Sequence, residues 1–171
     1  MPIGRDQRGS RTRDRGKHTD ITGFRLRHTV AQSDLPAVAE TRRLLRESLR
    51  RWGVPTLTDT AELLTTELVT NALQHTAGGA VLTATLTEEP GAPDAPPGRP
   101  VAARLRVEVH DSLARRPSPD TPHRAAAAAE AGDHGTSGRG LLLVQALADA
   151  WGAHPRGTGK VVWFELRARP A

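Results

Sequence analysis

Three polar side chains recur at intervals of four residues in one stretch of this chain: Glu67, Asn71 and His75. In a helix, which turns by ~100° per residue, side chains at this spacing lie close together on one face. A base, an amide and an imidazole would therefore share a single stripe. The stripe borders a wide apolar face, where a carboxylate and an amide are costly unless they have partners. A bound ligand or metal would supply those partners, although the polar border of an ordinary amphipathic helix gives the same pattern.

A glycine-rich segment, Gly-Thr-Ser-Gly-Arg-Gly at residues 135–140, stands directly before an apolar run. Glycine lets a backbone approach a ligand closely, and the amides and positive dipole at a helix N-terminus attract phosphate. The segment is therefore a candidate phosphate site. The alternative is a hinge that leads into a helix without binding anything. The run that follows is apolar on nearly every side, which predicts a buried helix over residues 140–151.

Asp111 stands at the end of an alternating segment and is a third candidate. A carboxylate at the end of a strand can accept a hydrogen bond from an exocyclic amine such as that of adenine. An aspartate that begins a turn would look the same in the sequence. Two common nucleotide motifs do not fit the chain. Gly159-Lys160 is followed by Val161 and a strand instead of the Ser or Thr and helix of a P-loop, and the Rossmann glycines would have to follow a strand directly.

The elements that must position these residues follow from hydrophobic periodicity. Alternation predicts strands, and apolar residues at helical spacing between capping and glycine signals predict helices. A Pro-rich loop over residues 88–100 and a long lid over about residues 112–138 interrupt the pattern. The resulting order is strand, two helices, two strands, lid, helix and two strands. It predicts an α+β two-layer sandwich whose mixed, mostly antiparallel sheet carries its helices on one face. We expect strands at 24–30, 80–87, 101–110, 153–154 and 160–167, and the first two helices at about 34–52 and 58–77.

Composition limits the class of protein. The chain has 171 residues, a net charge of +5 and no cysteine, which excludes disulfides and thiolate metal sites. Six basic residues and two acidic ones lie within the first 18, so we expect residues 1–20 to be a disordered basic tail and residues 21–171 to form a single domain. No apolar run approaches the ~20 residues of a membrane helix. These features favour a cytoplasmic protein without a membrane, and a nucleic-acid partner is disfavoured because no aromatic residue interleaves the arginines.

Taken in order, these motifs resemble the N, G1 and G2 boxes of the histidine-kinase-like ATPase family. The matching residues are Glu67-x-x-x-Asn71-x-x-x-His75, then Asp111-Ser112, then residues 138–144 (Gly-Arg-Gly-Leu-Leu-Leu-Val). The branch with the greatest resemblance is that of the anti-sigma-factor serine/threonine kinases and the small stand-alone ATP-binding regulators of actinobacteria. The resemblance covers about residues 24–168 and implies a Bergerat fold, with ATP bound between the second and third helices under the lid.

The resemblance also implies roles for individual residues. Asn71 would coordinate Mg²⁺ that bridges the phosphates, and Glu67 would be the general base that activates a hydroxyl or a water. Asp111 would bind the adenine amine. The remaining members of the implied ATP site are His75 as a supporting residue, Gly138 and Gly140 as phosphate-binding amides, Arg139 and Leu141 in the same segment, and Thr158 near the adenine.

The partners implied are an anti-anti-sigma-type (STAS) protein that would be phosphorylated on serine or threonine, a sigma factor that would be sequestered, and a second copy of the chain in a homodimer. One departure matters. The wider family has Asp-x-Gly-x-Gly in its G1 box, whereas Asp111 is followed by Ser-Leu-Ala-Arg at residues 112–115. The alternative function is therefore a module that retains ATP, or only the fold, for protein association without turnover.

Overall fold

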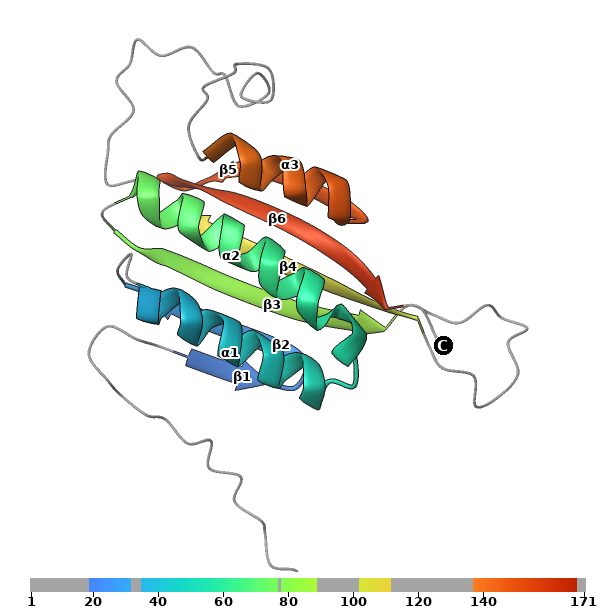
Figure 1. Ribbon diagram of the computed structural model, residues 1–171. Coiled ribbons are helices and arrows are strands. Elements are labelled where there is room, and N and C mark those ends of the chain that lie inside the picture. The colour runs from blue at the N-terminus through green and yellow to red at the C-terminus, as the bar shows by residue number, and fades with distance from the viewer. Residues whose placement is uncertain (1–18, 32–34, 77, 89–101, 112–136, 169–171) are drawn as a thin grey trace, which may run out of the picture.

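The computed structural model describes residues 19–31, 35–76, 78–88, 102–111 and 137–168, which form one sheet and its helices (Figure 1). The six strands lie in the order β1-β2-β3-β4-β6-β5, and every neighbouring pair is antiparallel. The predicted α+β fold is confirmed, with a sheet that is antiparallel throughout. The strands are β1 (Thr19–Thr22), β2 (Arg25–Val30), β3 (Ala80–Glu88), β4 (Ala103–Asp111), β5 (Ala150–Arg156) and β6 (Gly159–Ala168).

Strand alternation gives the sheet an inner and an outer face. In β4, Leu105, Val107 and Val109 are buried on the inner face, while the intervening charged residues lie on the outer face. Figure 1 shows the helices α1, α2 and α3 on the same side of the sheet. No described helix lies on the outer face. There, the Arg106 guanidinium stacks 3.9 Å from the centre of the Trp163 ring.

Two long helices form most of the second layer: α1 (Leu35–Arg51) and α2 (Thr58–His75), joined by the short 3-10 helix η1 (Pro55–Leu57). Their apolar stripes meet the inner face of the sheet, and Leu64 and Val69 of α2 are fully buried there. A bidentate ion pair also joins the two helices, because the Arg46 guanidinium donates to both oxygens of the Glu62 carboxylate at 2.6 and 2.7 Å. The helix α2, which carries Glu67 and Asn71, is therefore held to the sheet by apolar packing and to α1 by this ion pair.

The third helix, α3 (Ser137–Leu147), differs from the prediction in extent and in burial. It begins three residues earlier than expected and ends four residues sooner, so that Trp151 belongs to β5. Only one stripe of α3 packs against the core, around the fully buried Val144. Leu142, ~200° away on the helix, is 64% exposed, and Leu143 and Leu147 are exposed too. The expectation of a helix buried on every side was wrong, because α3 lies at the edge of the helical layer.

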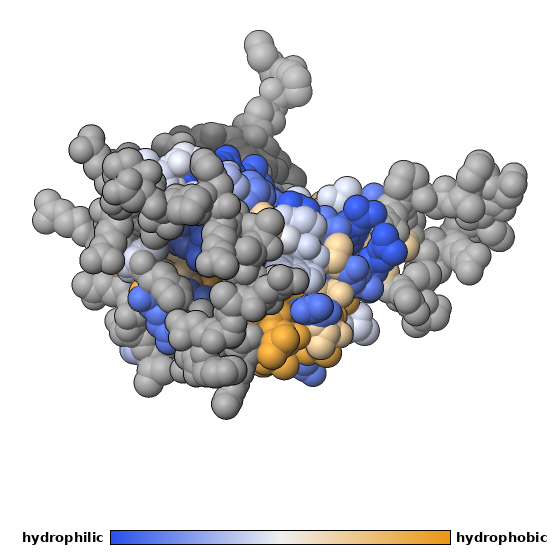
Figure 2. All heavy atoms as spheres, turned by 90° about the horizontal axis from the view of Figure 1, so that it is seen from above, coloured by the Kyte–Doolittle hydropathy of each residue, from blue (hydrophilic) through white to orange (hydrophobic). Residues whose placement is uncertain are grey.

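Several predictions fall outside the described residues: most of the basic tail (1–18), the Pro-rich loop (89–101) and most of the lid (112–136). The strand β1, which begins at Thr19, was not predicted. Seen from above, an apolar area lies among hydrophilic side chains on the side where α3 lies (Figure 2). Among the helices of the described part, none combines the length and apolar composition that a membrane crossing needs.

Candidate functional site

Asp111 ends β4 in the middle of the sheet, between Ala80 of β3 and Lys160 of β6. Its side chain faces the helices and is almost completely buried, with 1% of the residue exposed. The backbone amide of Lys160 donates to Asp111 Oδ1 at 3.0 Å, and the Lys160 ammonium lies 3.7 Å from Oδ2. A Cβ at Gly159 would overlap the Asp111 carbonyl group, so this close approach of β6 requires glycine. The strand pairing thus fixes the position of the carboxylate.

Glu67 and Asn71 meet α3 at Gly140. A Cβ placed on Gly140 would lie 2.7 Å from Glu67 Oε2 and 3.2 Å from Asn71 Nδ2, so the α3 backbone packs directly against both side chains. Glu67 and Asn71 are half-buried, as their place at the border of the apolar face predicted. The structure therefore brings Gly140 together with Glu67 and Asn71, which are separated from it by about 70 residues in the sequence.

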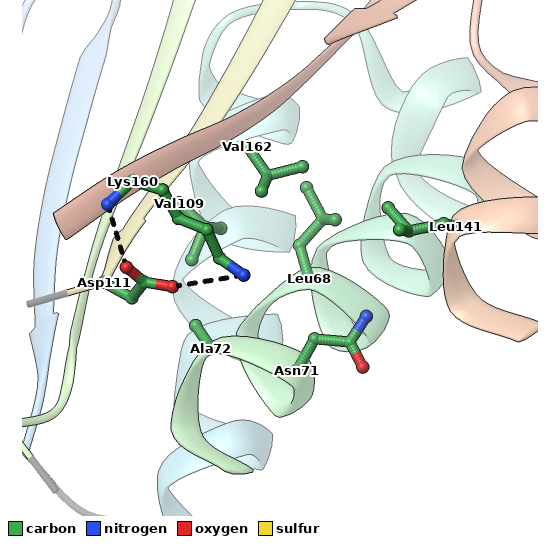
Figure 3. Close-up of a pocket in the computed structure, with 8 residues that line it drawn as sticks. All are labelled: Leu68, Asn71, Ala72, Val109, Asp111, Leu141, Lys160 and Val162. Atoms are coloured by element: carbon green, nitrogen blue, oxygen red, sulfur yellow. Dashed lines mark hydrogen bonds and ion pairs between the residues drawn. The ribbon is translucent and has the colours of Figure 1, made fainter. Parts of the chain in front are cut away.

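A small pocket lies between Asn71 and Asp111 (Figure 3). It has a volume of about 60 Å³, and its walls come from α2, β4, α3 and β6. The Asn71 amide, the Asp111 carboxylate and the Lys160 ammonium are its polar groups, and the rest of the lining is apolar. A few polar groups in an otherwise apolar hollow are typical of small-molecule sites. The lining residues are Leu68, Asn71, Ala72, Val109, Asp111, Leu141, Lys160 and Val162.

Thr158, which the family resemblance placed near the adenine, does not line this pocket. It is exposed in the turn between β5 and β6, next to Gly157 with its positive φ of 60°. Lys160, two residues further along the chain, lines the pocket instead of Thr158. It is the functional candidate that sequence reasoning missed. The signal that could have found it is the antiparallel pairing of β4 with β6, which sets Lys160 opposite Asp111.

Other predicted site residues are described in part. His75 is the last residue of α2, and Gly138 and Arg139 lie in the first turn of α3. The side chains of His75 and Arg139 lie outside the described residues. The described part of the chain contains no group of three or more His, Asp or Glu side chains that could hold a metal ion.

Comparison with known families identifies the class of protein. The sequence profile described as "Histidine kinase-like ATPase domain" matches residues 31–166, which is most of the chain. The chain belongs to this family, and an ATPase domain of this kind binds ATP. No curated protein and no solved structure matches the chain.

Proposed function

We propose that the chain is an Mg-ATP-dependent serine/threonine kinase that phosphorylates an anti-anti-sigma-type (STAS) protein and also binds a sigma factor. The observation that carries the proposal is the packing of Gly140 against Glu67 and Asn71. A base, a metal-binding amide and a glycine backbone are thereby within contact of one another. Asp111 supports the proposal because it lines the same pocket as Asn71 and can accept a hydrogen bond from an adenine amine.

The chemistry assigned to these residues is a direct phosphoryl transfer. The Glu67 carboxylate accepts the proton of the partner's hydroxyl while that oxygen bonds to the γ-phosphorus. The bond from the γ-phosphorus to the β–γ bridging oxygen breaks, and ADP leaves with the electron pair of that bond. Such a reaction depends mainly on positioning and on stabilising charge, with one base to take the proton. The amides at the N-terminus of α3 would face the phosphates.

A magnesium ion fits the donor set at this site. Mg²⁺ is usually bound by one or two protein oxygen ligands together with waters and substrate phosphates, and not by an all-protein cage. The lack of a cluster of metal-binding side chains among the described residues agrees with that mode. The Asn71 amide oxygen would be the protein ligand, and the ion would neutralise charge on the phosphates.

The competing proposal is an association module that binds ATP without turnover. The sequence that follows Asp111 favours it, since Ser112, Leu113 and Ala114 replace the glycine-bearing pattern of the wider family. The two proposals agree on nucleotide binding and differ on transfer. An experiment that measures both properties on the same variants separates them.

The test compares Glu67→Gln and Asn71→Ala with the wild type. ATP affinity is measured by isothermal titration calorimetry with and without Mg²⁺, and transfer is measured with γ-labelled ATP and a panel of anti-anti-sigma-type proteins. Glu67→Gln should bind ATP within about threefold of the wild type and lose transfer by at least ~100-fold, the contribution of a general base. Asn71→Ala should weaken the Mg²⁺-dependent part of ATP binding. Glu88→Gln is the matched control, because Glu88 is exposed at the opposite end of β3 from the Asp111 pocket.

Equal transfer rates in the wild type and Glu67→Gln would refute the role of Glu67 as base. ATP binding by the wild type without transfer to any member of the panel would favour the association module. Failure of the wild type to bind ATP at all would refute both the kinase and the ATP-binding module, and would leave the alternative in which only the fold is retained for protein association.

A further inference from the structure

The Asp111 carboxylate is buried, and within the described part of the chain it accepts a hydrogen bond at Oδ1 but not at Oδ2. Among the described residues, Oδ1 accepts the Lys160 backbone amide at 3.0 Å, while the Lys160 ammonium lies 3.7 Å from Oδ2, beyond hydrogen-bond distance. With 2% of the side chain exposed, this carboxylate has little access to bulk water. A carboxylate offers about four acceptor positions on its two oxygens, so Oδ2 has the capacity to accept a donor from a ligand.

The Lys160 side chain is placed to respond to such a ligand. Its backbone is fixed by the pairing of β6 with β4 and by the contact of Gly159 with Asp111. Its side chain, by contrast, is 48% exposed and ends beside the pocket, pointing toward Asp111 (Figure 3). The amide that holds Oδ1 can therefore stay in place while the ammonium moves.

The pocket itself is small for a nucleobase. A volume of about 60 Å³ is room for about two water molecules, whereas ligand pockets usually exceed about 300 Å³. A nucleobase that reaches Asp111 would meet the Lys160 side chain, which lines the same pocket. Lys160 is the most exposed of the lining residues, and its long side chain can turn without disturbing the core. Entry of a base can therefore displace the ammonium from Oδ2.

We propose that Lys160 is a specificity-determining residue for the nucleobase: when Asp111 accepts the exocyclic amine, the Lys160 ammonium donates to a ring nitrogen beside that amine. The inference rests on the proposed binding of ATP. In adenine the amine is flanked by two ring acceptors, N1 and N7, so a donor that leaves Oδ2 finds an acceptor close by. Two hydrogen bonds to the base thus replace a long ion pair within the protein.

The test deletes each acceptor from the ligand and the donor from the protein. Calorimetry on the full chain gives the affinities for ATP, 1-deaza-ATP and 7-deaza-ATP with Mg²⁺. The wild type should bind one of the two analogues about tenfold more weakly than ATP, which corresponds to about 1.4 kcal/mol and to one hydrogen bond with a charged partner. In Lys160→Met, ATP and that same analogue should bind equally. The readout is this ratio, because the substitution also removes the contact of Lys160 with Asp111.

Arg156→Met is the matched control. Arg156 is exposed on the same hairpin and carries the same charge, but it does not line the pocket, so this variant should keep the discrimination of the wild type. Equal binding of ATP and both analogues by the wild type would overturn the inference, and that result does not depend on the folding of any variant. Discrimination that survives in Lys160→Met would overturn it too. Both results leave ATP binding itself intact and are distinct from failure of the proposed function, in which the wild type binds no ATP.

Discussion

Gly140→Ala should separate the function of the site from the stability of the fold. The substitution adds one methyl group at the point where α3 touches α2. That methyl carbon would lie 2.7 Å from Glu67 Oε2, and 3.2 Å from both Glu67 Cβ and Asn71 Nδ2. Ordinary contacts of a Cβ begin near 3.4 Å. The Glu67 carboxylate must therefore move by about 0.7 Å, from 2.7 Å to the ordinary 3.4 Å, and the Asn71 amide by a few tenths of an ångström.

The two consequences of this shift differ in size. Stability should change little, because replacing glycine by alanine within a helix gains about 1 kcal/mol, the Glu67 carboxylate can rotate away, and the contact with Glu67 Cβ needs a shift of only a few tenths of an ångström. A net change within about 1 kcal/mol shifts the melting temperature by less than about 4 °C in a chain of this length. Function is more sensitive, since a misplacement of about 1 Å can lower a rate by about 100-fold. We expect phosphoryl transfer to fall by about 10- to 100-fold and Mg-ATP affinity by up to about tenfold.

Thermal unfolding, calorimetry with Mg-ATP and single-turnover transfer on the same preparations measure both quantities. Ala146→Gly is the reciprocal control on α3: Ala146 is exposed and does not line the pocket, so this variant should lose about 1 kcal/mol of stability and keep the transfer rate of the wild type. If Gly140→Ala transfers phosphate at the wild-type rate, the packing of Gly140 against the two side chains is irrelevant to the site. A loss of activity that only follows a loss of folded protein would refute the reasoning as well.

Two further predictions concern the fold around the site. Gly159→Ala should lower the free energy of unfolding in urea by at least about 2 kcal/mol, because its Cβ would overlap the backbone of Asp111. Gly157→Ala in the same hairpin has open space at its Cβ and should cost only about 1 kcal/mol through its positive φ, so equal losses in the two variants would contradict the contact. On α3, Leu142→Lys should change stability by less than about 0.5 kcal/mol, since Leu142 is exposed, whereas Val144→Ala should cost clearly more. A large loss in Leu142→Lys would show that this side of the helix is covered.

Local sequence signals predicted most of the layer that carries the candidate site. The helix α2 was predictable because its apolar face and its polar stripe repeat over 18 residues. The strand β4 was equally predictable, since apolar residues alternate with charged or polar ones along most of its length. The position of Asp111 at the end of this strand was predictable too, because the alternation stops there. The family resemblance assigned Gly140 and Glu67 to one ATP site, but their contact was not predicted, because no local pattern reports which distant segments meet.

The errors arise where long-range contacts decide the structure. The strand β1 has four residues, of which Ile21 alone is strongly apolar, and its pairing with β2 defines it. The end of α3 was misplaced because the apolar run continues to Trp151. In the structure the Asp149 carboxylate accepts the Arg167 amide at 2.7 Å, and the Asp149 amide donates to the Glu165 carbonyl at 2.9 Å. These bonds to β6 turn the chain from helix into strand.

Lys160 escaped notice for the same reason. Its position beside Asp111 is a property of strand register, and a shift of one residue in the pairing of β4 with β6 would send its side chain to the other face. The composition and spacing of the sequence around Lys160 contain no sign of that pairing.

The alternation of β4 also determines how this protein can change over time. Asp111 and Val109 face the helices, whereas His110 and Glu108, their immediate neighbours in the chain, face the side without a described helix. A substitution at either outer position alters the exposed surface and leaves the pocket lining in place. Selection can therefore act on the outer face of the sheet and on the pocket as two nearly independent traits, although both are encoded by alternate codons of one short stretch.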